Sequence, residues 1–67
     1  MLRNLKAEMV RNRITHKQLA SFLGISTKTV SNKIAGSYDW KYRETVKVRN
    51  EFFPDLEIEY LFGREEE

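Results

Sequence analysis

Short hydrogen-bonding side chains gather in residues 27–32, which read Thr-Lys-Thr-Val-Ser-Asn. Val30 and Ile34 stand four residues apart, so in a helix they share one face and point into a core. The opposite face then carries hydroxyl, amide and ammonium groups, which form hydrogen bonds without a cofactor. The members of this outer set are Thr27, Lys28, Ser31 and Asn32. The stretch predicts a helix whose outer face binds a partner through hydrogen bonds; the alternative is an ordinary solvated face.

The sequence contains few residues suited to covalent catalysis or metal binding. The chain has no cysteine and one histidine, His16, so we expect no metal site. No serine–histidine or histidine–carboxylate group stands at a useful spacing, no glycine-rich loop could hold a phosphate, and 67 residues are too few for a deep pocket. We therefore expect no enzyme activity, no cofactor and no small-molecule ligand. The lack of a long apolar run or leader pattern argues against a membrane protein and favours the cytoplasm.

Boundary signals along the chain predict an all-α fold, a compact bundle of about five short helices. Thr15 followed three residues later by Gln18 is a capping-box pattern, and Gly24 is suited to end the helix that this box opens. Ser26 can cap the next helix, and Pro54 stops a later one because it lacks an amide donor. We expect helices at residues 2–12, 16–23, 27–35, 41–53 and 56–62, in one domain over residues 1–62 followed by an acidic tail at 63–67.

The second and third of these helices are joined by only three residues. Such a short connection does not allow an antiparallel pair, so the helices should cross at a steep angle. Ala20 is small enough to permit close approach. The spacing of Ala20, Gly24 and Val30, a small residue, a glycine and a β-branched residue, is the pattern of a helix-turn-helix.

Charge is divided unevenly along the chain. Residues 1–50 hold eleven Lys or Arg and three acids, a net charge of +8, whereas residues 51–67 hold one Arg and seven acids, a net charge of −6. This asymmetry is typical of a body that faces a polyanion and turns its acidic end away. The alternative is an uneven surface that serves solubility alone.

The segment ITHKQLASFLGISTKTVSNKIAG, residues 14–36, resembles the helix-turn-helix of the lambda-repressor-like Cro/Xre superfamily. More narrowly, NLKAEMVRNRITHKQLA, TVSNKIAG and FFPDLEIEYLF resemble small phage regulators of Gram-positive hosts. The likeness covers nearly the whole chain, and the motif is specific for the superfamily but not for an operator. It implies a five-helix bundle that binds double-stranded operator DNA, usually as a symmetric dimer, with helix 27–35 in the major groove.

By position, the resemblance implies that bases are read chiefly by three residues of helix 27–35. Asparagine can pair with adenine through two hydrogen bonds, and lysine can donate to guanine. Hydroxyl groups can meet a polar base edge, and the threonine methyl can contact thymine. The implied base-reading residues are Thr27, Lys28 and Asn32, with Thr29 and Ser31 in secondary roles.

Two positions depart from the family pattern. The first residue of helix 16–23 is often Gln in relatives and is His16 here, which changes the group available for contacts to phosphate and bases. Relatives often carry a threonine cap after an aromatic residue at the start of the fourth helix. In this chain Lys41 follows Trp40, which weakens the cap and adds a cation.

Cations near both ends of the reading helix suit the DNA backbone. The amino end of helix 16–23 also offers free amides and the positive end of the helix dipole. The alternative for each cation taken singly is plain solubility. The predicted phosphate-binding residues are His16, Lys17, Lys33, Lys41 and Arg43, whereas Lys47 and Arg49 are expected to be solvated.

Aromatic residues concentrate late in the chain, and a chain of this size can hardly bury all of them. We expect some to remain exposed and to form a two-fold contact. Two reading helices must lie about 34 Å apart to meet successive major grooves, so a homodimer would suit DNA binding. The predicted interface residues are Phe53, Ile58, Tyr60, Leu61 and Phe62.

The leading hypothesis is a sequence-specific DNA-binding regulator of transcription, most simply a phage or prophage repressor that occludes a promoter. An activator would use the same helix, so the two are not separated by the sequence. The alternative is a protein-interaction module on the same fold, antirepressor-like or antitoxin-like, whose working surface is the acidic aromatic end. The initial Met and the acidic end favour a complete small protein over the first part of a longer repressor.

Overall fold

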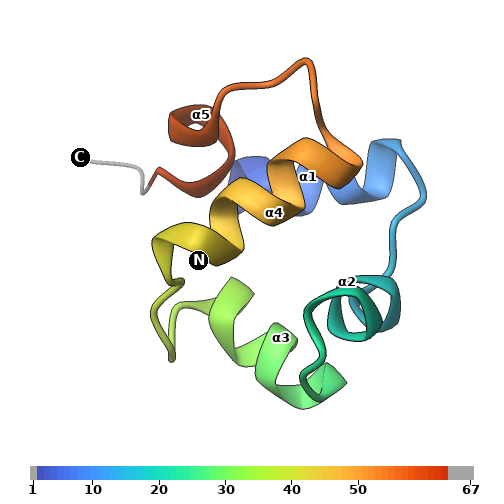
Figure 1. Ribbon diagram of the computed structural model, residues 1–67, viewed down its shortest axis with the longest axis vertical. Coiled ribbons are helices and arrows are strands. Elements are labelled where there is room, and N and C mark those ends of the chain that lie inside the picture. The colour runs from blue at the N-terminus through green and yellow to red at the C-terminus, as the bar shows by residue number, and fades with distance from the viewer. Residues whose placement is uncertain (1, 64–67) are drawn as a thin grey trace.

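A computed structural model describes residues 2–63, and all regular structure within them is helical (Figure 1). This confirms the all-α prediction. Met1 and residues 64–67, which hold most of the expected acidic tail, lie outside the described residues. The helices are α1 (Arg3–Arg11), α2 (His16–Leu23), α3 (Thr27–Ala35), α4 (Tyr42–Phe52) and α5 (Ile58–Phe62).

Helices α2 and α3 begin and end at the residues expected from the sequence, and the others are shorter by one or two residues at their ends. The largest difference is at α5, which begins at Ile58 instead of residue 56. Pro54 follows α4, and the Leu56 amide donates to the Phe53 carbonyl oxygen at 3.0 Å. This turn occupies the residues that were expected to open the last helix.

The start of α2 is fixed by side chains close in sequence. The Gln18 amide donates to Thr15 Oγ1 at 3.1 Å, and the Thr15 amide donates to Gln18 Oε1 at 2.7 Å. These two bonds complete the predicted capping box and satisfy two amides that a helix end leaves without partners. Ser26 caps α3 in the same manner, since its Oγ accepts from the Thr29 amide at 3.1 Å.

Three helices end in the same left-handed turn, but only two of the turns use glycine. Gly24 after α2 and Gly36 after α3 have φ of 73° and 99°. After α1 the corresponding residue is Arg13, with φ of 57°. The Ile14 amide then donates to the Met9 carbonyl oxygen at 2.8 Å, which is the long hydrogen bond of a Schellman ending. Arg13 thus holds a backbone conformation that side-chain-bearing residues adopt at a cost.

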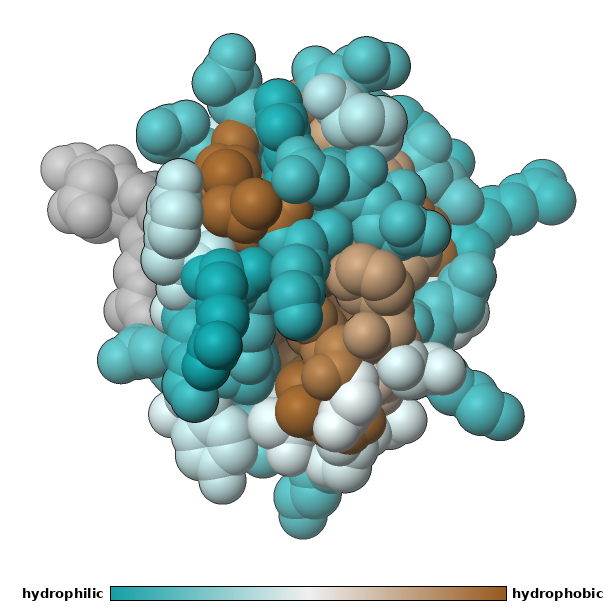
Figure 2. Space-filling model, in the orientation of Figure 1, coloured by the Kyte–Doolittle hydropathy of each residue, from teal (hydrophilic) through white to brown (hydrophobic). Residues whose placement is uncertain are grey.

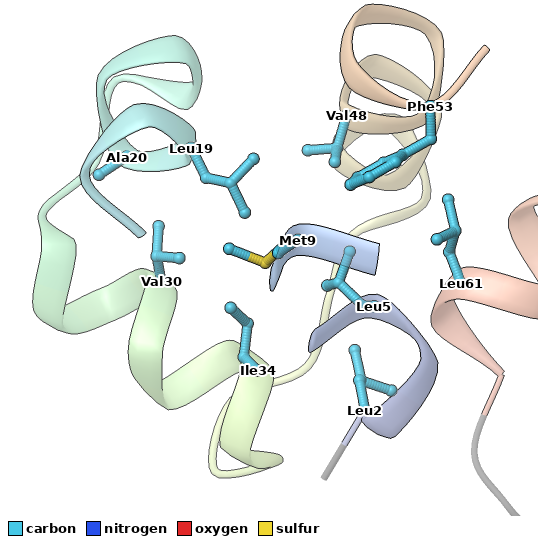
Figure 3. Packing of buried hydrophobic residues seen from close by; sticks show 10 residues of the cluster. All are labelled: Leu2, Leu5, Met9, Leu19, Ala20, Val30, Ile34, Val48, Phe53 and Leu61. Carbon is cyan, nitrogen blue, oxygen red and sulfur yellow. The ribbon is translucent and has the colours of Figure 1, made fainter. Parts of the chain in front are cut away.

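The core joins all five helices, and α3 supplies its inward stripe as predicted. Val30 and Ile34 are buried and point toward Met9 of α1 and Leu19 of α2 (Figure 3). The Leu2 amide also donates to the Ile34 carbonyl oxygen at 3.0 Å, which ties the start of the chain to the end of α3. The buried apolar side chains are Leu2, Leu5, Met9, Leu19, Ala20, Val30, Ile34, Val48, Phe53 and Leu61.

Two residues expected on a dimer surface belong to this core instead. Phe53 is 3% exposed and Leu61 is 0% exposed, so neither can contact a second molecule. Both lie where α4 and α5 close over Leu5 of α1 (Figure 3). A helix as short as α5 has one side to bury against α1 and α4, and Leu61 occupies it. The prediction of an interface role is wrong for these two residues.

Polar contacts attach α5 to α1 around the apolar core. Glu8 is buried, and its Oε2 accepts from the Tyr60 hydroxyl at 2.8 Å and from Arg11 Nη1 at 3.0 Å. The hydrogen bond to Glu8 raises the pKa of the Tyr60 phenol above the ordinary tyrosine value. Asn4 Nδ2 donates to the Tyr60 carbonyl oxygen at 2.8 Å. Tyr60 is therefore held by both its side chain and its backbone.

The strained ending of α1 gives a stability prediction. We expect Arg13→Gly to raise the free energy of unfolding by about 1 kcal/mol, since relief of a left-handed residue is worth roughly 1–2 kcal/mol and the added flexibility of the unfolded chain offsets part of it. Urea denaturation followed by Trp40 fluorescence measures the change.

Arg13→Ala is the matched control for this prediction. It removes the same side chain but keeps a Cβ in the left-handed region, so its free energy of unfolding should not rise. Equal stabilisation by alanine and glycine would contradict backbone strain at Arg13 and would point to the charge of the side chain instead.

Candidate nucleic-acid interface

The outward side of α3 presents the polar residues expected there. Thr27 and Lys28 are exposed, and Ser31 and Asn32 are partly exposed, while Val30 and Ile34 lie beneath them in the core. Figure 1 shows α2 nearly end-on where α3 runs across the view, so the two helix axes are steeply inclined. The short connection therefore leaves the outer side of α3 uncovered by α2.

Thr29 is turned toward the start of its own helix. Its Oγ1 lies 2.8 Å from Ser26 Oγ, which also accepts from the Thr29 amide. The side chain is only partly exposed. Thr29 therefore contributes to the cap of α3, and its hydroxyl is less available to a partner than that of Thr27.

His16 joins the start of α2 to the outer side of α3. Its Nδ1 lies 2.8 Å from Ser31 Oγ, and both residues are partly exposed. His16 was expected to contact phosphate and Ser31 to contact bases. The hydrogen bond between them, across fifteen residues of sequence, was not foreseen, because nothing in the two local patterns indicates that they meet.

Lys33 does not lie where a phosphate contact requires it. The residue is 8% exposed, and its Nζ donates to the Asp39 carbonyl oxygen at 2.9 Å and to Glu44 Oε1 at 3.1 Å. The ammonium group also lies 5.8 Å from the centre of the Trp40 ring. These contacts hold the Lys33 ammonium inside the protein, so the structure argues against its predicted role at phosphate. Its position near the end of the reading helix suggested contact with the DNA backbone, whereas the loop after α3 folds back over it.

The same ion pair fixes the start of α4 beside the end of α3. Glu44 Oε1 also accepts from the Lys41 amide at 2.9 Å, which satisfies an amide at the start of the helix. Burial by itself would raise the pKa of the Glu44 carboxyl, but the hydrogen bonds from the Lys41 amide and the Lys33 ammonium outweigh it and lower that pKa below the ordinary value of 4.5. Glu44 is therefore a positioning residue that was not among the predicted site residues.

The remaining predicted cations are exposed. Lys17 lies in the first turn of α2, and Lys41 and Arg43 lie at the start of α4. Residues 9–38 contain no aspartate or glutamate, so no acid from that stretch offsets the cations on α2 and α3. Arg49, expected to be solvated, instead donates from Nε to the Leu56 carbonyl oxygen at 2.8 Å and supports the turn before α5.

An open pocket of about 440 Å³ lies beside the amino end of α4 and reaches α5. The rings of Trp40 and Phe62 meet there edge to face, with centres 4.9 Å apart. Trp40 Nε1 is buried and has no hydrogen-bond partner among the described residues. Of the predicted interface residues, Ile58 and Phe62 are partly buried in this lining, and Tyr60 is exposed.

Apolar surface also occurs away from the predicted interface. Figure 2 shows brown side chains over α2 and its turn into α3, and a second group beside α5, with hydrophilic surface over α4 between them. Phe22 of α2 is 41% exposed, and its ring packs edge to face on Phe52 at 5.4 Å between centres. This packing still leaves part of the Phe22 side chain exposed.

Within residues 2–63, no group of three or more metal-binding side chains is found. None of the helices described has the length and apolar character needed to cross a membrane. Comparison with known proteins finds no matching family model, no matching curated protein and no matching solved structure. The interpretation of this surface therefore depends on its own geometry.

The lowered pKa of Glu44 predicts how stability changes with pH. Because the carboxyl binds its proton less readily when folded, its stabilising effect is complete above the ordinary pKa of 4.5 and is lost as the pH falls through the lower folded value. The difference in free energy of unfolding between the natural protein and Glu44→Gln should be constant between pH 6 and 7 and should shrink below pH 4.5. Urea denaturation at several pH values measures it.

Glu51→Gln is the control for this experiment, since Glu51 is an exposed glutamate of the same helix. We expect its free energy of unfolding to follow that of the natural protein at every pH. A Glu44→Gln difference that stays unchanged down to pH 3 would contradict the paired, ionised state of Glu44.

Proposed function

We propose that this chain is a sequence-specific DNA-binding regulator of transcription, in which α2 and α3 form a helix-turn-helix and α3 enters the major groove. The observation that carries the proposal is the division of α3 into a buried apolar stripe and an uncovered polar side. The acid-free stretch of residues 9–38 supports it, because an approaching phosphate backbone meets cations there without opposing carboxylates. The likeness to the Cro/Xre superfamily agrees with this proposal.

The base-reading chemistry belongs to Thr27, Lys28 and Asn32. Lysine donates to the guanine acceptors of the major groove, and the asparagine amide both donates and accepts in the pattern that adenine offers. Thr27 stands at the exposed start of α3, where its hydroxyl and methyl groups can meet a base or a thymine methyl. Ser31, which is hydrogen-bonded to His16, keeps a secondary role in base reading.

The phosphate contacts are assigned to exposed groups on two elements. At the amino end of α2, the exposed cation Lys17 and the positive end of the helix dipole favour a bound phosphate. At the amino end of α4, Lys41 and Arg43 supply the second grip. Lys33 is left out of this set because its ammonium group is bound within the protein.

A homodimer on DNA completes the proposal. In a two-fold dimer the two α3 helices are separated by twice the distance of α3 from the axis, and they would have to lie roughly 34 Å apart to meet successive major grooves. The molecule measures 31 × 26 × 22 Å, a size at which two copies can reach that separation. With Phe53 and Leu61 buried, the contact is assigned to Ile58, Tyr60 and Phe62. Sedimentation with a palindromic duplex should give two chains per duplex, and one chain per duplex would contradict the dimer.

Selection from a pool of random duplexes tests the function as a whole. A DNA-reading protein should enrich a defined motif, and a dimer should enrich two related half-sites with a fixed spacing. Failure to enrich any sequence would overturn the proposal.

A protein-interaction module on the same fold is the second candidate. The open pocket at the aromatic end, lined by Trp40, Ile58 and Phe62, favours it because it offers apolar surface to another chain. Tight binding of a partner protein together with no enriched sequence would support this candidate.

Two variants separate base reading from backbone attraction. We expect Asn32→Ala to cost roughly 1–3 kcal/mol of binding free energy on the selected site and to relax preference at one base pair. Lys41→Ala should weaken binding to all sequences alike and reduce the dependence of affinity on salt concentration. Fluorescence anisotropy on selected and random duplexes at several salt concentrations measures both effects.

Arg49→Ala is a control on the same helix as Arg43, since Arg49 is bonded to Leu56 and is not assigned to DNA. Its salt dependence on DNA should match that of the natural protein. An equal loss of affinity for Asn32→Ala on selected and random DNA would contradict base reading by Asn32.

A further inference from the structure

The described part of the chain ends close to the exposed cations at the start of α4. Gly63 follows α5, and its amide donates to the Glu59 carbonyl oxygen at 3.0 Å, which ties its backbone to the helix. The ring of the preceding residue, Phe62, meets the Trp40 ring with centres 4.9 Å apart, and Lys41 is the next residue after Trp40. The end of α5 therefore lies beside the start of α4, on the same side of the molecule (Figure 1).

The sequence continues from this point with acidic residues. Residues 64–67, which lie outside the described residues, read Arg-Glu-Glu-Glu and have a net charge of −2. A chain spans at most about 3.3–3.6 Å per residue, so these four residues reach no further than roughly 14 Å from Gly63. A short tether of this kind keeps its end at a high effective concentration near the point of attachment. The three carboxylates are thus confined to the neighbourhood of the start of α4.

The charges at the start of α4 favour an acidic occupant. Lys41 and Arg43 are exposed, and neither forms an ion pair with another described residue. The buried ammonium of Lys33 is already paired with Glu44 at 3.1 Å. Asp39 is the one acid in the described lining of the adjacent pocket. Two exposed cations therefore stand against one acid, and their charge is not fully offset within the described residues.

We propose that Glu65, Glu66 and Glu67 bind the exposed cations at the start of α4 in the same molecule and compete there with DNA phosphates. The occupant of this surface is thus a segment of the chain itself, the glutamate segment (residues 65–67). The contact needs only the charges and the short reach, whereas its effect on DNA binding rests on the proposed function. The segment lowers affinity for any duplex, and most strongly at low salt concentration, where exposed charges are least screened.

Amide NMR of the protein without DNA tests the contact itself. The natural protein is compared with a triple variant that carries Glu65→Gln, Glu66→Gln and Glu67→Gln. Apart from residues next to the segment in sequence, the shift differences should concentrate at Lys41 and Arg43 and fade in 1 M salt, where the screening length is about 3 Å. They should persist on tenfold dilution, because both partners belong to one molecule. No difference at the start of α4, or one that disappears on dilution, would overturn the inference.

Affinity for a random duplex tests the competition. The triple variant should bind about fivefold more tightly than the natural protein at low salt concentration, the worth of exposed ion pairs at roughly 1 kcal/mol in total, and the gain should shrink as salt is added. The matched control neutralises three exposed acids elsewhere, by Glu51→Gln, Asp55→Asn and Glu57→Gln. Its net charge changes by the same amount. An equal gain in this control would overturn the inference, since net charge alone would then explain the effect.

Removal of the cations completes the test. In a protein that carries Lys41→Ala and Arg43→Ala, neutralising the glutamate segment should raise affinity no more than the control substitutions do. A full fivefold gain in that background would overturn the inference while the proposed function stands. If the natural protein binds no duplex, the competition fails together with the proposed function, and the NMR comparison still decides whether the contact forms.

Discussion

The burial of Val30 and Ile34 beneath α3 is the constraint on which the rest of the surface depends. A nine-residue helix is marginal by itself in water, so its orientation comes from packing and not from its own propensity. Burying a Val or Ile side chain is worth about 1.5–3 kcal/mol, more than most local preferences of a polar side chain. Once these two side chains contact Met9 and Leu19, the polar residues have only the outer side of the helix left.

Two of the three acids in residues 1–50 hold other parts of the protein in place. Glu8 holds Tyr60 and Arg11, and Glu44 holds Lys33 and the start of α4. Both carboxylates are therefore hydrogen-bonded to partners within the protein. Residues 9–38 contain no aspartate or glutamate, so no acid of that stretch offsets its exposed cations.

The sequence predicts those features that depend on residues close together. Helix periodicity and cap spacing determine which nearby residues meet. They therefore predict the capping box of Thr15, the glycine after each of α2 and α3, and the buried stripe of Val30 and Ile34. Contacts between residues far apart in the sequence are not predicted, because the local pattern around each residue does not indicate which distant residue it will meet. The burial of Lys33 against Glu44, the Tyr60 bond to Glu8, and the burial of Phe53 and Leu61 belong to this second kind. Arg13 is a third case. Ile14 packs against the core, and the turn before it places Arg13 in a left-handed conformation that arginine does not favour.

Two side-chain hydrogen bonds join α3 to elements that carry exposed cations. Ser31 is bonded to His16 at the start of α2, beside Lys17, and Lys33 is bonded to Glu44 at the start of α4, near Lys41 and Arg43. Both bonds run through side chains that are at most partly exposed, so they restrict the motion of α3 relative to its neighbours. If α3 reads bases as proposed, the distance between base contacts and phosphate contacts is set by these two bonds and not by long flexible side chains alone. The register of the protein on DNA would then depend as much on Glu44, which contacts no DNA, as on the residues that do.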